Sequence, residues 1–189
     1  MSDRMADVSP RPWARTTGVI YLLYFLTALS AEAIVGRGRP VAYEAVTLLS
    51  YAFYVALTLL FYRMFRPVNA RLSLLAAFFS LVGCAIEVLG VFLPAFHGVL
   101  PLAFFGPYCL LIGYLIFRST FLPRALGVLM MLAGLGWLIF LTPLASALSP
   151  YLKGVGFIAE LLLCLWLVVM GVNVPHWQER TRASPMGHA

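Results

Sequence analysis

The chain has 189 residues, of which 62% are hydrophobic and only 11% are charged, and its formal net charge is +6. Soluble domains average about 45–50% apolar and about 25% charged residues, and a domain of this size buries only about 70% of its surface. The composition therefore excludes a soluble globular domain, a disulfide-rich secreted scaffold, a disordered chain and a nucleic-acid-binding protein. It predicts an all-α, polytopic membrane protein.

Six apolar stretches are long enough to cross a bilayer, which takes about 20 mostly apolar residues. In chain order they are approximately residues 15–36, 43–63, 72–93, 101–118, 124–148 and 152–174. Proline, glycine or arginine residues separate them, and proline in particular ends helices because it lacks a backbone N–H. The sequence thus predicts a six-transmembrane-helix bundle over residues 15–174, between short polar tails at residues 1–14 and 175–189.

The arginine and lysine residues are distributed unevenly between the two ends of this bundle. Ten of the 13 lie in the two tails and in the second and fourth connections, and the other three are Arg37, Arg39 and Lys153. The side of a membrane protein that is richer in basic residues faces the cytoplasm. We therefore expect a multi-pass protein of the plasma membrane, the inner membrane in a bacterium, with both termini cytoplasmic, as an even number of spans requires.

Small and polar residues recur at helical spacing on one face of several predicted spans. The third span has Ser80, Gly83, Glu87 and Gly90 on one face, and the sixth has Gly156, Glu160, Cys164 and Gly171. The fifth has Gly127 and Gly134, seven residues apart. Small residues let helices approach closely in lipid, so we expect these faces to pack against protein.

Glu87 and Glu160 are the most informative residues, because both fall inside predicted spans. A charge at the bilayer centre costs roughly 2.5–3.5 kcal/mol on insertion scales, so such residues generally face the protein interior. Counted at 1.5 Å per residue from the predicted span ends, both carboxylates lie about 9–12 Å below the outer surface. We expect them at similar heights in the outer half of the bundle.

Other polar and aromatic residues collect towards the same outer end. They are Glu32, Glu44, Arg37, Arg39, His97, Tyr51 and Tyr108. Together with the two intramembrane carboxylates they predict an outward-facing polar pocket that binds a ligand. A kink is expected near this pocket, because Pro107 falls within the fourth span.

Three states are open to the two carboxylates. They can be protonated, accept hydrogen bonds from tyrosine hydroxyls or from Arg37 and Arg39, or bind a cation. His97 with the two carboxylates would be a reasonable set of metal ligands, but no spacing in the sequence specifies a metal, and we assign none. The sequence identifies no cofactor and no catalytic residue.

Four segments resemble an uncharacterised bacterial family known as domain of unknown function 4386. They are Arg15-Thr-Thr-Gly-Val-Ile-Tyr-Leu-Leu, Leu122-Pro-Arg-Ala-Leu-Gly-Val-Leu, Ala133-Gly134, and the segment from Glu160 through Trp166 to Gly171. The resemblance covers nearly the whole chain. It implies a six-helix integral membrane protein and no activity.

Three functions remain open at this point. The first is a protein that binds or carries a small apolar, amphiphilic or lipid-like ligand in the pocket around Glu87 and Glu160, with membrane lipid as its surroundings. The second is an intramembrane enzyme in which the two glutamates act as acid and base or hold a metal with His97. The third is a structural or assembly subunit whose buried acids only join helices. The sequence does not determine the oligomeric state.

Overall fold

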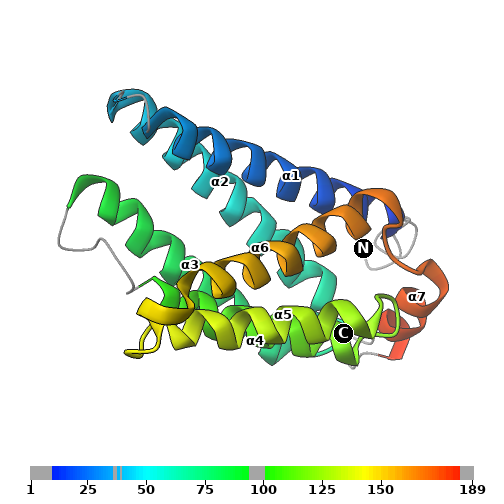
Figure 1. The fold of residues 1–189 in the computed structure, drawn as a ribbon. Helices are drawn as coiled ribbons and strands as arrows, with labels where there is room; N and C mark the ends of the chain where they lie inside the picture. Colours follow the sequence, from blue (N-terminus) through cyan, green and yellow to red (C-terminus); the bar gives the residue numbers. More distant parts are fainter. Residues whose placement is uncertain (1–9, 36–37, 39, 94–100, 184–189) are drawn as a thin grey trace.

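The computed structural model describes residues 10–35, 38, 40–93 and 101–183, and in these residues it contains helices and no strands (Figure 1). The helices are α1 (Pro10–Val35), α2 (Pro40–Phe65), α3 (Ala70–Phe92), α4 (Leu102–Arg118), α5 (Arg124–Ile139), α6 (Ala145–Val169) and α7 (Val174–Ala183). The all-α fold expected from the composition is confirmed.

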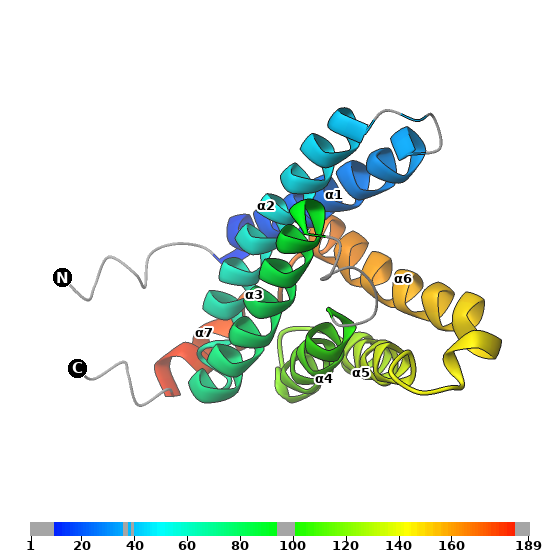
Figure 2. The ribbon, with the colours of Figure 1, turned by 90° about the vertical axis from the view of Figure 1, so that its left-hand side faces the viewer.

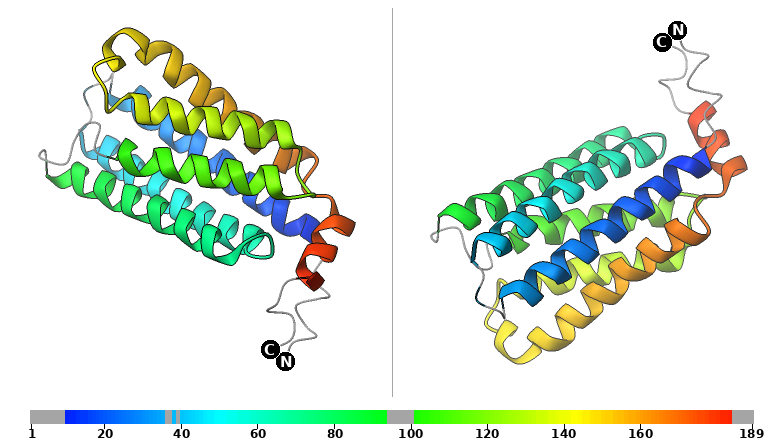
Figure 3. Two further views of the ribbon diagram at one scale, coloured as in Figure 1. Left: turned by 90° about the horizontal axis from the view of Figure 1, so that it is seen from below. Right: turned by 90° about the horizontal axis from the view of Figure 1, so that it is seen from above.

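The first six helices form a closed ring in chain order. Each packs against the next one, and α6 packs against α1 to complete the ring (Figure 2). Successive helices run in opposite directions, so the start of α1, the α2–α3 and α4–α5 turns and α7 lie at one end of the bundle (Figure 3). Contacts confirm this grouping, because Phe65 stacks on Phe121 and the Asn173 N–H donates to the Phe121 carbonyl at 3.1 Å.

The outer surface of the bundle is apolar, unlike the surface of a soluble protein. The outer surfaces of the helices carry large apolar side chains, such as Leu26, Phe78 and Ile158, each more than half exposed. The interior holds hydroxyl groups, and Thr58 Oγ1 lies 2.6 Å from Ser80 Oγ across the α2–α3 contact. An apolar surface around a partly polar interior is the arrangement that a lipid environment stabilises.

Within the part of the chain that the structure describes, four helices are long and apolar enough to cross a membrane, namely α1, α2, α3 and α6. The chain is therefore a multi-pass membrane protein. With 17 and 16 residues, α4 and α5 extend roughly 24–26 Å at 1.5 Å per residue, slightly less than a hydrocarbon core of about 30 Å. The predicted count of six spans depends on these two shorter helices and stays a prediction.

Glycines hold α4 and α5 at very close range. A Cβ atom added to Gly113 would lie 2.6 Å from the Gly127 carbonyl oxygen, and one added to Gly134 would lie 2.7 Å from the Gly106 carbonyl oxygen. The two glycines of each helix are seven residues apart, and the helices are antiparallel, so the pairs meet two turns apart along the contact. The glycine face predicted for the fifth span is confirmed, and its partner face on α4 was not foreseen.

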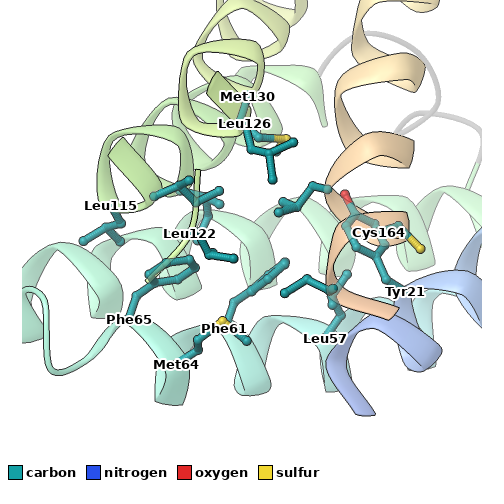
Figure 4. Close-up of a cluster of buried hydrophobic side chains, with 14 of the residues drawn as sticks. Tyr21, Leu57, Phe61, Met64, Phe65, Leu115, Leu122, Leu126, Met130 and Cys164 are labelled. Carbon is teal, nitrogen blue, oxygen red and sulfur yellow. The ribbon is translucent and has the colours of Figure 1, made fainter. Parts of the chain in front are cut away.

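The core of the bundle continues from this contact towards α2. It includes Leu57, Phe61 and Phe65 of α2 with Leu115 of α4 and Met130 of α5, all at most 1% exposed (Figure 4). The small-residue faces predicted for the third and sixth spans are also buried. Hydrophobic packing and small-residue contacts therefore stabilise the same ring of helices.

The predicted boundary between the fifth and sixth spans is wrong. We expected the fifth span to reach residue 148 and a break at Ser149-Pro150, but α5 ends at Ile139 and α6 begins at Ala145. The chain turns at Thr142-Pro143, because a residue before proline avoids the helical conformation. Pro150 is the sixth residue of α6, where the missing N–H removes one hydrogen bond near the start of the helix without ending it.

The C-terminal tail expected at residues 175–189 contains a helix, α7. The chain leaves α6 through Gly171, whose φ of +68° lies in the left-handed region that favours glycine. Trp177 of α7 then packs against the core. This anchoring explains why a segment of polar composition is ordered. At the other end of the chain, α1 begins at Pro10, five residues earlier than expected.

Candidate functional site

Glu160 is the most deeply buried charged residue in the described part of the chain. Its side chain is 8% exposed, and its Oε2 accepts a hydrogen bond of 2.8 Å from the Tyr21 hydroxyl. Tyr21 is 2% exposed and lies on α1, whereas Glu160 lies on α6. The bond therefore crosses the contact that closes the ring of helices, and Figure 4 shows Tyr21 beside Cys164 at this contact.

Glycine and cysteine bring α1 and α6 close enough for this hydrogen bond. A Cβ atom on Gly18 would lie 2.6 Å from the backbone nitrogen of Val168, so only glycine fits without displacing α6. The Cys164 thiol donates to the Gly18 carbonyl at 3.5 Å. Since the helices are antiparallel, Gly18 and Tyr21 on α1 meet Cys164 and Glu160 on α6 in reversed order.

Three further tyrosines lie near the Tyr21–Glu160 pair, and we call Tyr21, Tyr24, Tyr54 and Tyr108 the tyrosine cluster. The ring centroids of Tyr24 and Tyr54 are 4.7 Å apart, and those of Tyr54 and Tyr108 are 6.1 Å apart, both edge to face. Tyr21 and Tyr24 follow at 6.2 Å. Three helices, α1, α2 and α4, thus place phenol groups around the carboxyl group of the fourth, α6.

The Glu160 carboxyl group interacts electrostatically with the other members of the tyrosine cluster and with the Cys109 thiol. Among the described residues, no lysine, arginine or histidine forms an ion pair with it. A buried carboxyl group without a basic partner is costly unless hydrogen bonds or a bound cation stabilise it. The described groups that interact with the Glu160 carboxyl group are tyrosine phenols and the Cys109 thiol.

Glu87 belongs to a second part of the same region. It is half-buried on α3 and interacts with the Tyr51 hydroxyl of α2 through a hydrogen bond. Tyr24 interacts electrostatically with both Glu87 and Glu160, which links the two parts of the region. One turn from Tyr51, the buried Thr47 Oγ1 has no hydrogen-bond partner in the described residues.

The two carboxyl groups lie at different distances from the ends of their helices. Glu87 lies five residues before the end of α3, about 8 Å from it at 1.5 Å per residue. Glu160 lies 15 residues after the start of α6, about 22 Å from it, because that helix begins seven residues before the predicted span. These distances do not give the depth of either group in the membrane, so the expected similar depth stays a prediction.

The remaining predicted site residues divide into two groups. Tyr51 and Tyr108 lie in the region, whereas Glu32 is exposed near the end of α1 and Glu44 is half-buried near the start of α2. Arg37, Arg39 and His97 fall outside the described residues. The residues that the structure describes contain no group of three metal-ligating side chains, so they give no support to a metal centre.

Sequence reasoning did not assign Tyr21, Tyr24, Tyr54 or Cys109 to the site. Tyr21 and Tyr54 did fall on the packed faces of their spans, which was a usable signal. No spacing connects Tyr21 with Glu160, because 139 residues separate them. Tyr24 and Cys109 had no signal in the sequence, since apolar neighbours surround both.

Comparisons with known proteins cover part of this chain. A family described as "Domain of unknown function (DUF4386)" matches residues 95–171, which include α4, α5 and α6. An uncharacterized protein of Archaeoglobus fulgidus is 32% identical over 143 residues, covering 70% of this chain and 86% of the relative. The chain belongs to the domain of unknown function 4386 family. The resemblance seen in the sequence is confirmed.

No solved structure matches the chain. The segment matched to the domain of unknown function 4386 contains Glu160, Tyr108 and the glycine pairs of α4 and α5. It does not contain Tyr21 or Glu87. Membership of the domain of unknown function 4386 family therefore identifies the family of the protein but assigns no role to Glu160. That role has to be inferred from the geometry around the Glu160 carboxyl group.

Proposed function

We propose that this integral membrane protein binds a small or lipid-like ligand inside its helix bundle, with Glu160 as the principal contact. The observation that carries the proposal is the 2.8 Å hydrogen bond between Tyr21 and a glutamate that is only 8% exposed. Intramembrane carboxyl groups are costly, and they commonly mark ligand or ion pathways. A purely apolar α1–α6 contact would hold the two helices without that cost.

The chemistry of the region favours a ligand that carries hydrogen-bond donors or a positive charge. Carboxyl and phenol oxygens accept hydrogen bonds, and the faces of tyrosine rings attract cations. Glu160 has no basic partner among the described residues. In the proposed complex, a donor group of the ligand takes the place of the Tyr21 hydroxyl at Glu160, and its apolar part lies along the bundle interior.

The arrangement favours binding over acid–base catalysis. An enzyme that used both glutamates would need their carboxyl groups within about one water molecule of a shared reacting atom. Here Glu160 interacts with Tyr21 and Glu87 with Tyr51, on different helices. These separate partnerships suit a site that holds two parts of one ligand.

Native mass spectrometry of the protein in mild detergent tests the proposal. Dodecylamine and dodecyl maltoside, one cationic and one neutral, serve as probes alongside any ligand retained from the cell. We expect the wild type to retain a ligand or dodecylamine, and Glu160→Gln, which keeps the shape but removes the charge, to lose most of it. Glu32→Gln is the matched control, because Glu32 is exposed near the end of α1.

Retention that is equal in the wild type and Glu160→Gln would contradict the role given to Glu160. A wild type that binds neither probe and carries no ligand would contradict ligand binding itself. In that case the third function, a structural role for the buried acids, would account for the geometry.

We further propose that the protein lies in the plasma membrane with both ends cytoplasmic. The excess of ten basic residues over three at the end that holds the start of α1 and α7 supports this orientation. A fluorescent protein fused to the C-terminus should fluoresce, whereas alkaline phosphatase fused there should be inactive. The reverse result would show the opposite orientation or an odd number of spans.

A further inference from the structure

Seven arginines gather at the end of the bundle that holds the start of α1, and we call this the arginine end. They are Arg11, Arg15, Arg63, Arg66, Arg71, Arg118 and Arg124, all exposed. They come from three separate places in the chain, the start of α1, the α2–α3 turn and the α4–α5 turn. The stacking of Phe65 on Phe121 joins the two turns, and Arg63 lies over the Trp13 ring, which joins the start of α1 to the end of α2 (Figure 3).

Among the described residues of this end, positive charge far exceeds negative charge. In the described part of the chain, Glu179 of α7 is the acidic residue found here, and it pairs with His176 at 3.3 Å. The other described acids, Glu32, Glu44, Glu87 and Glu160, lie in the middle or the opposite half of the bundle. The arginine end therefore presents a concentrated positive charge next to the membrane.

The described residues of this end include arginines and no lysine, whereas Lys153, the described lysine, lies at the other end near the start of α6. The planar guanidinium group donates paired hydrogen bonds that match phosphate oxygens, which an ammonium group cannot do. Aromatic rings hold two of the groups, with Arg63 over Trp13 at 5.5 Å and Arg124 over Phe117 at 5.7 Å. Such stacking leaves the edge of the guanidinium group free to donate.

Three of these arginines share a helix face with an exposed apolar side chain that lies four residues further along the helix. One turn beyond Arg15 lies Val19, 47% exposed, and one turn beyond Arg124 lies Val128, 41% exposed. Beyond Arg71, on α3, lies Leu75, 42% exposed. Residues four apart share a helix face, so each arginine stands at the head of an apolar strip. A phosphate with acyl chains attached fits this pattern better than a free anion.

We infer that the arginine end binds the headgroup phosphates of anionic phospholipids, with Arg15, Arg71 and Arg124 as the contacts nearest the acyl chains. Basic residues at the membrane surface attract anionic lipids, each contributing independently. The inference does not depend on the ligand proposed for Glu160, because the two sites share no residue.

The test uses the full-length protein in detergent with an equal mixture of phosphatidylglycerol and phosphatidylcholine of identical acyl chains. Native mass spectrometry counts the lipids retained. We expect the wild type to prefer phosphatidylglycerol, and the triple variant Arg15→Gln, Arg71→Gln and Arg124→Gln to lose this preference by roughly tenfold or more. Excess inorganic phosphate should not displace the lipid, which separates a lipid site from a phosphate site.

Lys153→Gln is the matched control, since it removes one exposed basic group at the other end and should leave the preference unchanged. The triple variant keeps seven of the ten basic residues on its side against three, so the orientation of the protein should persist. An equal preference for phosphatidylglycerol in the wild type and the triple variant would overturn the inference. Displacement by inorganic phosphate alone would also overturn it.

Discussion

Replacing Gly113 with leucine should lower the melting temperature of the protein in detergent by roughly 5–10 °C. The reason is the contact between α4 and α5, where a Cβ atom at residue 113 would lie 2.6 Å from the Gly127 carbonyl oxygen. A backbone atom cannot move aside as a side chain can, so the helices must separate. Overpacking of this kind costs about 1–3 kcal/mol or more, and 1 kcal/mol corresponds to about 2–4 °C in a chain of this size.

Tryptophan fluorescence during heating measures this effect, and size-exclusion chromatography checks the folded state at the start. Gly154→Leu on α6 is the matched control, because no atom lies within 4 Å of a Cβ atom added there. We expect the control to melt within about 2 °C of the wild type. If both variants melted alike, the close approach of α4 and α5 would not be a determinant of stability.

Tyr21→Phe should destabilise the protein by about 1–3 kcal/mol, although it removes a single oxygen atom. The change leaves the buried Glu160 carboxyl group without its 2.8 Å hydrogen bond, and an unsatisfied buried polar group costs its full desolvation free energy. Replacing both partners by apolar groups of similar shape is often neutral. The double variant Tyr21→Phe with Glu160→Met should therefore regain most of the lost stability.

Thermal unfolding of the two single variants and the double variant gives this coupling as a double-mutant cycle. Tyr114→Phe is the control, since Tyr114 is 41% exposed and its hydroxyl forms no described hydrogen bond across the bundle. Additive effects of the two substitutions would show that the pair does not act as a unit. A stable double variant that fails to bind ligand would show that Glu160 is retained for binding and not for packing.

The helix boundaries show where sequence reasoning succeeded and where it failed. Arg118 to Arg124, with Pro123, separates α4 from α5 as expected, because a charged, proline-containing turn interrupts an apolar stretch. At Pro150 the same reasoning was wrong, because the position of a proline within a helix decides whether the helix ends there. Pro150 lies inside α6 because α5 ends at Ile139 and α6 begins at Ala145. Residues 139–148 are mostly apolar, so their composition does not show where one helix ends and the next begins.

The candidate site was predictable in part. Glu87 and Glu160 stood out because carboxylates are rare in apolar spans. Their partners Tyr51 and Tyr21 were less distinct, since tyrosine is common in membrane proteins. The distance predicted from Glu160 to the start of its helix was too short, because the start of α6 was misplaced. An error of seven residues at a helix end corresponds to roughly 10 Å along its axis.

The sequence by itself determined the class of the protein, because the free energy of transfer into lipid depends on composition along the chain and not on tertiary contacts. It also determined which helix faces pack inwards, since small and polar residues recur at helical spacing. Only the tertiary structure decided which of these faces meet. The ring closes where Gly18 lets α1 approach α6 closely enough for Tyr21 to reach Glu160, a contact between residues 139 positions apart. Helix periodicity is local, whereas the pairing of faces depends on the shape of all six helices at once.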